Sequence, residues 1–518
     1  MMDEQRILIW LSERLSVCVA LLAILLLGVP AYAQAPAGKS PVEGSAAGST
    51  ATVIFSNIPE HKGPVYELLE GLGCKYVGAV AGVPSSEVWS VPSDELARVS
   101  GLLQTRDVKV TKLGADWNHI LNRHQGPLTP AQNELMGNAK AEPGAVGVHV
   151  MRAPDPAVSA YAMTSKKERA PARIVLPINA TTNITLERTR YVLDERGSAW
   201  RGVVVETGES AVLIRWNDGQ ITGVVGYKGH IYRVSGLGGD LHAVIETDPR
   251  NLPPDHGPLK PTLDPRAELR PDAPIGPGEV LRAPAVTPFP DADRLALEAE
   301  QVTIDVMMLY TNRASRRSLR TERLLAVSIE EVNETFRNSG LGNISLRLVH
   351  TELVDYDESD GSHFDHLFRM VDGVGPFKDI RKLRNEKKAD IVGLVVDDAS
   401  GCGQSTRVAP DADEAFFVAH HSCAVIAITI AHEIGHIFGA RHDRAIDPRN
   451  VPFAYGHGYV KGSKWRDIMS YRQSCGGCVR IPFWSNPRVT YKGEPMGTPM
   501  EDNARVILEQ AERVSKFR

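Results

Sequence analysis

His432-Glu433-Ile434-Gly435-His436-Ile437-Phe438-Gly439-Ala440-Arg441-His442 lies within and just beyond an apolar, helix-forming run. Residues four apart share one face of a helix, so His432 and His436 project their imidazoles side by side, at the separation that one metal ion requires. Glycine readily takes the left-handed conformation that ends a helix, so Gly439 can turn the chain back. We therefore expect His442 to reach the same ion.

Three neutral imidazoles leave a fourth position open for water, which is the pattern of catalytic rather than structural zinc sites. Glu433 adjoins the first histidine and can act as a general base on that water, whose pKa the metal lowers. The sequence thus predicts one catalytic Zn²⁺ and hydrolysis of peptide bonds in protein or peptide substrates. Glu433→Ala is expected to abolish hydrolysis while zinc stays bound.

The pattern from His432 to His442 resembles the elongated zinc signature of metzincins, and Asp443 resembles the adamalysin, or reprolysin, branch. Downstream, Asp467-Ile468-Met469-Ser470-Tyr471 is similar to the family's Met-turn, which implies that Met469 forms an apolar floor beneath the imidazoles. Tyr471 stands where astacins and serralysins place a tyrosine that ligates zinc or steadies the oxyanion. Packing in the core or pocket is the favoured interpretation of Tyr471.

The resemblance covers about Val302 to Arg518 and implies a mixed α/β, metzincin-type domain with a twisted sheet and an active-site helix. Alternating patterns agree with this fold. They predict strands at 302–310, 344–354, 389–396 and 414–419 and helices at 321–338, 363–383 and 425–438. We expect 414–419 to be the edge strand that pairs with an extended peptide, and the apolar run 481–487 to line the pocket beyond the cut bond.

The preceding residues divide by composition. Residues 51–115 predict an α+β unit of order βαββαβ, and 145–250 a small all-β pro-domain built as a sandwich or roll. Residues 251–300 are rich in proline and predict an extended, exposed linker to a catalytic domain at 301–518. The whole is expected to be a zymogen.

Residues 1–33 have the basic start, short apolar run and Ala31-Tyr32-Ala33 ending of a secretory signal peptide. They predict a secreted or periplasmic protein with no membrane attachment after cleavage. A formal net charge of -5 gives no basic footprint for nucleic acid. The oligomeric state is left open.

Four cysteines of the catalytic region form an even set, for which we favour the disulfides Cys402–Cys423 and Cys475–Cys478. Cys74, the odd cysteine, is either a zymogen switch that occupies the open zinc position or, by default, a buried packing thiol.

Weaker patterns favour ordinary interpretations. His420 and His421 are adjacent and are expected to be solvated loop residues. Asp355, Asp357 and Asp360, which precede Gly361, weakly suggest a Ca²⁺ loop, but a solvated loop is favoured. Two alternative functions stay open at this point: a catalytically silent binding protein that retains the fold, and a zinc hydrolase of non-peptide bonds.

Overall fold

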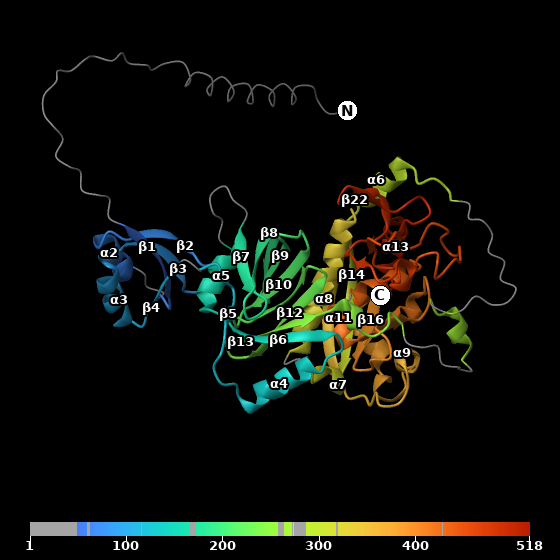
Figure 1. Cartoon of the computed structure of the whole chain (residues 1–518), viewed down its shortest axis with the longest axis horizontal. Coiled ribbons are helices and arrows are strands. Elements are labelled where there is room, and N and C mark those ends of the chain that lie inside the picture. The colour runs from blue at the N-terminus through green and yellow to red at the C-terminus, as the bar shows by residue number, and fades with distance from the viewer. Residues whose placement is uncertain are drawn as a thin grey trace, which may run out of the picture. The chain divides into compact units, whose positions relative to one another are not determined.

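A computed structural model describes residues 49–59, 63–114, 117–164, 172–256, 264–271, 273, 286–317, 320–426 and 428–518, of which Thr50 to Arg518 belong to one compact unit (Figure 1). The predicted signal peptide lies outside the described residues. Within the described part of the chain, no helix is long and apolar enough to cross a membrane.

A four-stranded antiparallel sheet with two helices begins the described chain, in the element order that the sequence predicts. Its members are β1 (Thr50–Ser56), α2 (Gly63–Gly71), β2 (Lys75–Ala79), β3 (Glu87–Pro92), α3 (Leu96–Gln104) and β4 (Lys109–Lys112), with strand order β2-β3-β1-β4. Its apolar core contains Phe55, Leu69, Trp89 and Leu103.

A nine-stranded antiparallel sheet follows, with strand order β5-β6-β13-β12-β11-β10-β9-β8-β7. Its strands are β5 (Asn122–Arg123), β6 (Ala145–Arg152), β7 (Arg173–Pro177), β8 (Asn183–Asp194), β9 (Gly197–Val204), β10 (Ser210–Trp216), β11 (Ile221–Tyr227), β12 (His230–Gly238) and β13 (Leu241–Thr247), and helix α4 (Pro130–Lys140) lies between β5 and β6. A bridge from His119 to Val175 joins the chain just before β5 to β7, so the two ends of the sheet meet.

The all-β expectation for this region misses helix α5 (Pro156–Thr164). Ala157, Val158 and Ala160 of α5 pack against Ile54 and neighbouring residues of the first sheet. Because most of this helix is buried, its residues are apolar on several sides and give no amphipathic signal.

The remaining elements form a five-stranded sheet flanked by helices. They are α6 (Asp291–Ala299), β14 (Val302–Thr311), α7 (Asn312–Ser315), α8 (Thr321–Asn338), β15 (Ile344–Val354), α9 (His363–Val371), α10 (Ile380–Lys387), β16 (Ile391–Val396), β17 (Gly403–Ser405), β18 (Phe416–His420), α11 (His421–Ile426), α12 (Thr429–Phe438) and α13 (Asn503–Val514). Short strands β19 (Val460–Lys461), β20 (Trp465–Arg466), β21 (Val479–Arg480), β22 (Asn486–Tyr491) and β23 (Glu494–Met496) lie between α12 and α13.

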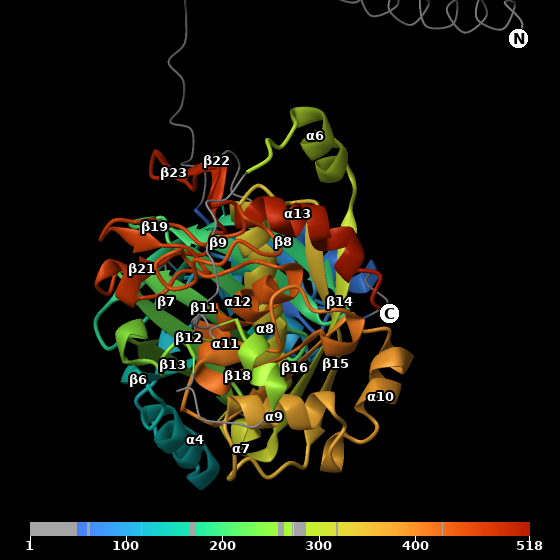
Figure 2. The ribbon, with the colours of Figure 1, turned by 90° about the vertical axis from the view of Figure 1, so that its right-hand side faces the viewer.

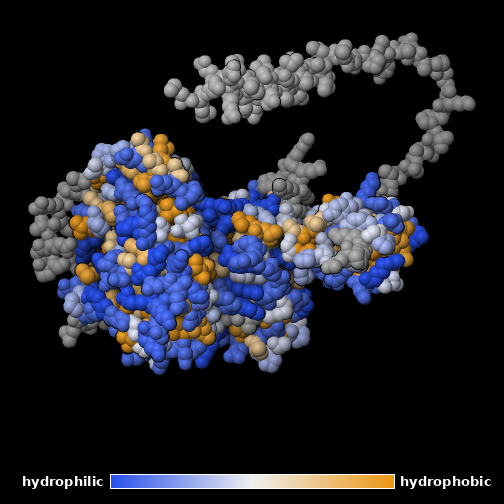
Figure 3. Space-filling view, turned by 180° about the vertical axis from the view of Figure 1, so that it is seen from behind, coloured by the Kyte–Doolittle hydropathy of each residue, from blue (hydrophilic) through white to orange (hydrophobic). Residues whose placement is uncertain are grey.

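Both faces of this sheet are covered, which explains the apolar run of β16. Along β14, Val306 and Met308 pack with residues of α8, α12 and α13, whereas Met307 and Leu309 pack with α9 and α10. Alternate residues of a strand point to opposite faces, so the two helix layers lie on opposite sides of the sheet (Figure 2). On the face drawn in Figure 3, hydrophilic side chains predominate and apolar ones gather in small groups.

Two expectations about this sheet are wrong. The sheet order is β15-β14-β16-β18-β17, so β18 is internal and the edge strands are β15 and β17. β17 was missed because it has three residues and no apolar alternation. The helix expected at 363–383 is two helices, α9 and α10, because Gly373 and Gly375 between them take positive φ values of 67° and 61°.

The nine-stranded sheet packs on helix α8. Its residues Val212, Ile214 and Val224 share one hydrophobic core with α8 and α12. Arg323 of α8 lies 2.8 Å from Asp218, and Arg201 of β9 pairs with Glu330 of α8. The linker also joins this packing, since Leu252 belongs to the same core, and its first residues are not the exposed chain that the sequence predicts.

Candidate active site

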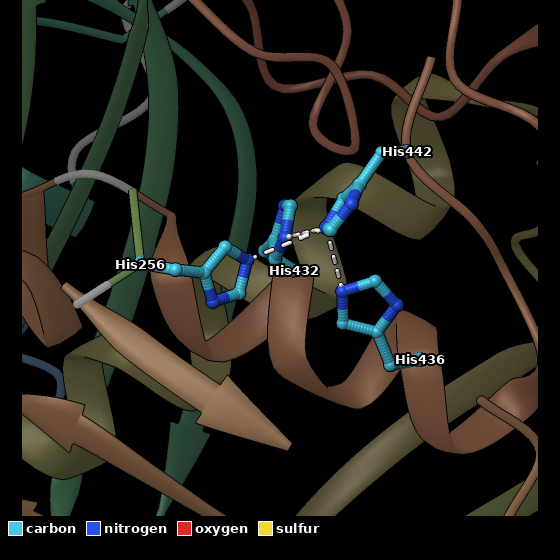
Figure 4. A group of neighbouring side chains, drawn as sticks. All are labelled: His256, His432, His436 and His442. Carbon is cyan, nitrogen blue, oxygen red and sulfur yellow. Dashed lines mark hydrogen bonds between the residues drawn. The ribbon is translucent and has the colours of Figure 1, made fainter. Parts of the chain in front are cut away.

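Helix α12 is completely buried and carries His432, Glu433 and His436. It ends at Gly439, whose φ of 119° is a conformation that other residues rarely adopt. A Cβ atom at this glycine would also lie 2.6 Å from Phe453 Cε2. The turn at Gly439 returns the chain so that His442 faces the two helical imidazoles (Figure 4).

The Nε2 atoms of the three predicted ligands converge. His442 Nε2 lies 3.2 Å from His432 Nε2 and 3.0 Å from His436 Nε2. Ligand nitrogens about 2.0 to 2.1 Å from a tetrahedral metal are about 3.3 Å apart, so the spacing fits one ion such as Zn²⁺.

Hydrogen bonds to backbone carbonyls fix the ring tautomers. His432 Nδ1 donates to Ile468 O at 2.9 Å, and His436 Nδ1 donates to Ala440 O at 2.8 Å. Because a carbonyl only accepts, each Nδ1 carries the proton and each Nε2 presents a lone pair to the cluster. Burial holds the pKa values of all three imidazoles well below the usual 6.5, so they are neutral, as metal ligands must be.

A fourth imidazole, His256, joins this cluster and was not foreseen from the sequence (Figure 4). Its Nε2 lies 3.3 Å from His442 Nε2, and its Nδ1 donates to Gly403 O at 2.8 Å. One proton on His442 could satisfy only one of the three lone pairs that face it, whereas a cation satisfies all of them. The four donors lie within 4.8 Å of one another and could hold a metal ion.

The edge strand β17 supports Glu433. Ser405 Oγ lies 2.7 Å from Glu433 O and 3.0 Å from Glu433 Oε2, within hydrogen-bonding distance of both. A Cβ atom at Gly403 would lie 2.5 Å from Glu433 Oε1. Only glycine therefore lets this strand approach the carboxylate so closely.

Met469 and Tyr471 contact different residues of the site. A Cβ at Gly435 would lie 2.8 Å from Met469 Sδ, so the methionine packs directly against α12. The ring centroid of Tyr471 lies 4.4 Å from that of His442, and its backbone N–H donates to Asp443 Oδ2 at 2.9 Å. Asp443, the residue that indicated the reprolysin branch, thus ties the Met-turn to the third histidine.

Two arginines next to the cluster hold a carboxylate. Arg480 Nη2 donates to Asp255 Oδ1 at 2.9 Å, and Arg466 Nη1 lies 3.8 Å from Asp255 Oδ2. Burial alone would raise the pKa of Asp255, but the arginine charges hold it below its usual value. The expectation of an apolar wall misses this charge, because the predicted range 481–487 begins one residue after Arg480.

His420 and His421 are buried, contrary to the expectation of solvated loop residues. His420 ends β18 and His421 begins α11, so a change of backbone geometry between them lets both face Asp397, at 3.8 Å and 3.0 Å. Asp397 also accepts from Arg317 at 2.7 Å. Asp397, His420 and His421 lie close enough together to hold a metal ion, and the guanidinium of Arg317 places a positive charge beside the same carboxylate.

Among the described residues, Asp355, Asp357 and Asp360 belong to no group that could hold a metal. Disulfides join Cys402 to Cys423 and Cys475 to Cys478, which is the pairing that the sequence favours.

Cys74 is a buried free thiol in the core of the first sheet, where burial raises its pKa. It is not a member of the imidazole cluster.

Comparison with known proteins points to one family. The family model for metallo-peptidase family M12, Reprolysin_5, matches residues 300–482. A peptidyl-Asp metalloendopeptidase of Xanthomonas campestris pv. campestris is 34% identical over 317 residues, covering 61% of this chain and 71% of that protein. One of Stenotrophomonas maltophilia is 33% identical over 324 residues, covering 60% and 72%.

The crystal structure of metalloproteinase-II from Bacteroides fragilis aligns with 68% of this chain and 94% of its own, at 12% identity and a TM-score of 0.36. The family model and the sequence relatives confirm the resemblance drawn from the zinc signature. The chain therefore belongs to the reprolysin-like M12 family of metallopeptidases and is a metalloendopeptidase.

Proposed function

We propose that this chain is a zinc-dependent endopeptidase, made as a secreted precursor, that cleaves peptide bonds at aspartate residues. The observation that carries the proposal is the convergence of three buried, neutral Nε2 donors next to Glu433 on the same helix. Neither alternative, the silent binding protein or the hydrolase of non-peptide bonds, is supported by relatives named as endopeptidases.

His432, His436 and His442 would hold the zinc ion, which supplies Lewis acidity toward the scissile carbonyl and the attacking water when bound. Glu433 takes the proton of that water and passes it to the leaving amine. Contacts with Ser405 and Gly403 hold its carboxylate in place before substrate arrives.

Aspartate preference is supported by Arg480 and Arg466, which already hold the Asp255 carboxylate beside the cluster. A substrate aspartate would make the same charge-assisted hydrogen bond to Arg480 and the same ion pair with Arg466, whereas asparagine would lack the charge. The names of the relatives, which specify peptidyl-Asp, agree with this assignment.

Secretion is supported by the two disulfides, which are typical of oxidising compartments. The signal-like pattern of residues 1–33 supports it as well.

Glu433→Gln tests the mechanism. It should lower kcat by about 10³-fold or more with one zinc per chain retained, because the ligands survive and the base does not. Glu352→Gln on β15, whose carboxylate is exposed, is the matched control and should leave kcat unchanged. Full turnover of a zinc-loaded Glu433→Gln protein would refute the assignment of the base.

Arg480→Gln tests the preference. The ratio of kcat/KM for peptides with Asp or Asn at the cleavage position should fall at least about tenfold, since a charged hydrogen bond is lost. An unchanged ratio would show that the arginine does not recognise the substrate carboxylate.

A further inference from the structure

His256 is presented to the cluster in the same way as the two helical ligands. All three rings donate Nδ1–H to a backbone carbonyl: His432 to Ile468, His436 to Ala440, and His256 to Gly403. Each Nε2 is therefore a lone pair that faces the other donors. A chance neighbour of a metal site has no reason to share this tautomer.

The chain that carries His256 is anchored along its length. Leu252 is buried in the core shared by the nine-stranded sheet and α8. Arg472 donates to Pro249 O and Arg250 O at 3.1 and 2.6 Å. Cys402 N donates to Pro254 O at 2.8 Å. These contacts fix the segment before its last two residues reach the site.

Asp255 occupies the place that the proposed function gives to a substrate side chain. Its carboxylate pairs with both Arg480 and Arg466, and its side chain is 11% exposed. Gly403 N donates to Asp255 O at 3.3 Å, so the segment also bonds to the edge strand β17, where an extended peptide would pair. The segment thus occupies three parts of the site at once: the fourth position of the imidazole cluster, the arginine pair and the edge strand β17.

We propose that Asp255 and His256 form a built-in plug that keeps the precursor latent: His256 is the fourth ligand of the zinc ion, and Asp255 fills the aspartate pocket as an internal pseudo-substrate. This inference rests on the proposed function. Four imidazoles make a closed coordination set with no position for water, whereas catalytic zinc sites keep one position open. Because the plug belongs to the same chain, its effective concentration at the site is high.

The plug is coupled to the N-terminal region, which here means the nine-stranded sheet and the elements before it. Leu252 lies four residues before His256 and shares a core with Val212 and Val224 of the nine-stranded sheet. Withdrawal of that sheet would remove part of the core around Leu252 and so weaken the anchoring of the plug. Release of the N-terminal region should therefore favour opening of the fourth position, while the contacts of the segment with Arg472 and Cys402 remain to be broken.

The test uses the full chain in the Glu433→Gln background, so that no self-cleavage removes the plug. Co²⁺ replaces zinc, and visible absorption together with X-ray absorption counts the coordinated imidazoles. We expect four in this chain and three plus solvent after the further substitution His256→Ala. The same substitution should lower Co²⁺ affinity at least about tenfold and allow a small hydroxamate to bind the metal. His350→Ala on β15, outside the cluster, is the matched control and should change none of these properties.

Asp255→Asn distinguishes the contribution of Asp255 in the arginine pocket from that of His256 as a metal ligand. It retains His256 but removes the charge held by the arginines, so hydroxamate should bind detectably faster than in the Glu433→Gln parent. If only three imidazoles coordinate Co²⁺ in the intact parent chain, the proposed plug is wrong, and this holds even if the variants fail to fold. The proposed function would still stand. Failure of the parent to bind one metal ion per chain would overturn the proposed function itself.

Discussion

Gly403→Ala is the sharpest test of how the site is supported. A methyl group there would lie 2.5 Å from Glu433 Oε1 and 2.6 Å from Thr429 Cγ2. Ordinary contacts begin near 3.5 Å, so the strand or the carboxylate must move by about 1 Å. A misplacement of about 1 Å at a reacting group costs about 10²-fold in rate, equivalent to about 2.7 kcal/mol of activation free energy.

The loss should appear in kcat rather than in zinc content, because none of the three heavy atoms nearest to the new methyl group belongs to an imidazole. Overpacking should also lower the free energy of unfolding by about 1 to 3 kcal/mol. Thr429→Ser removes the atom at 2.6 Å, so Thr429→Ser/Gly403→Ala should recover part of the stability and none of the activity.

Turnover is measured on a quenched-fluorescence aspartyl peptide and normalised to bound zinc, with the parent chain prepared in the same way. Gly342→Ala is the matched control, since its Cβ would have no heavy atom within 4 Å. A folded, zinc-loaded Gly403→Ala enzyme with parental kcat would refute the view that β17 positions the Glu433 carboxylate.

Three further outcomes follow from the structure. Removing the disulfide Cys402–Cys423, whose cysteines are 21 residues apart, should lower the free energy of unfolding by about 3 kcal/mol, because a longer closed loop restricts the unfolded chain more. Removing Cys475–Cys478, with a separation of 3, should lower it by about 2 kcal/mol. Chemical denaturation that ranks the two losses in the opposite order would contradict this dependence on loop length. Burial lowers the pKa of His242 to about 4, so between 6.5 and about 4 the unfolded chain binds a proton that the folded chain excludes, and about 3 kcal/mol of stability is lost as the pH falls through that window. In His242→Gln the acid part of the stability profile should be flatter, and an unchanged slope counts against this assignment. Because the Tyr471 ring packs on His442, Tyr471→Phe should keep kcat within about threefold while Tyr471→Ala weakens zinc binding; a loss in Tyr471→Phe of about 10²-fold would instead assign its hydroxyl to the oxyanion.

The metal-binding half of the site could be predicted because its geometry is local. Helical spacing places His432 beside His436, and Gly439 needs only its own conformational freedom to return His442. The main strands and helices around it follow from apolar patterns for the same reason. Such patterns depend on residues that are neighbours in sequence.

His256 and the arginine pair could not be predicted in this way. His256 lies 186 residues before His442 in a proline-rich segment, and composition alone assigns such a segment to solvent. Its position depends on the docking of the nine-stranded sheet, which no local pattern encodes. The single histidine of that segment was the one available signal, and it has no motif around it.

The edge segment Cys402–Ser405 serves the plug and the general base with different atoms. Gly403 uses its backbone N–H and carbonyl for Asp255 and His256, while its missing side chain makes room for Glu433. Ser405 contacts Glu433 through its hydroxyl, and the disulfide from Cys402 to α11 holds the start of the segment. Departure of the plug breaks none of the contacts that position the base. Activation of such a site therefore requires removal of a ligand and no refolding of the catalytic groups, which is how a precursor can be both inactive and fully assembled.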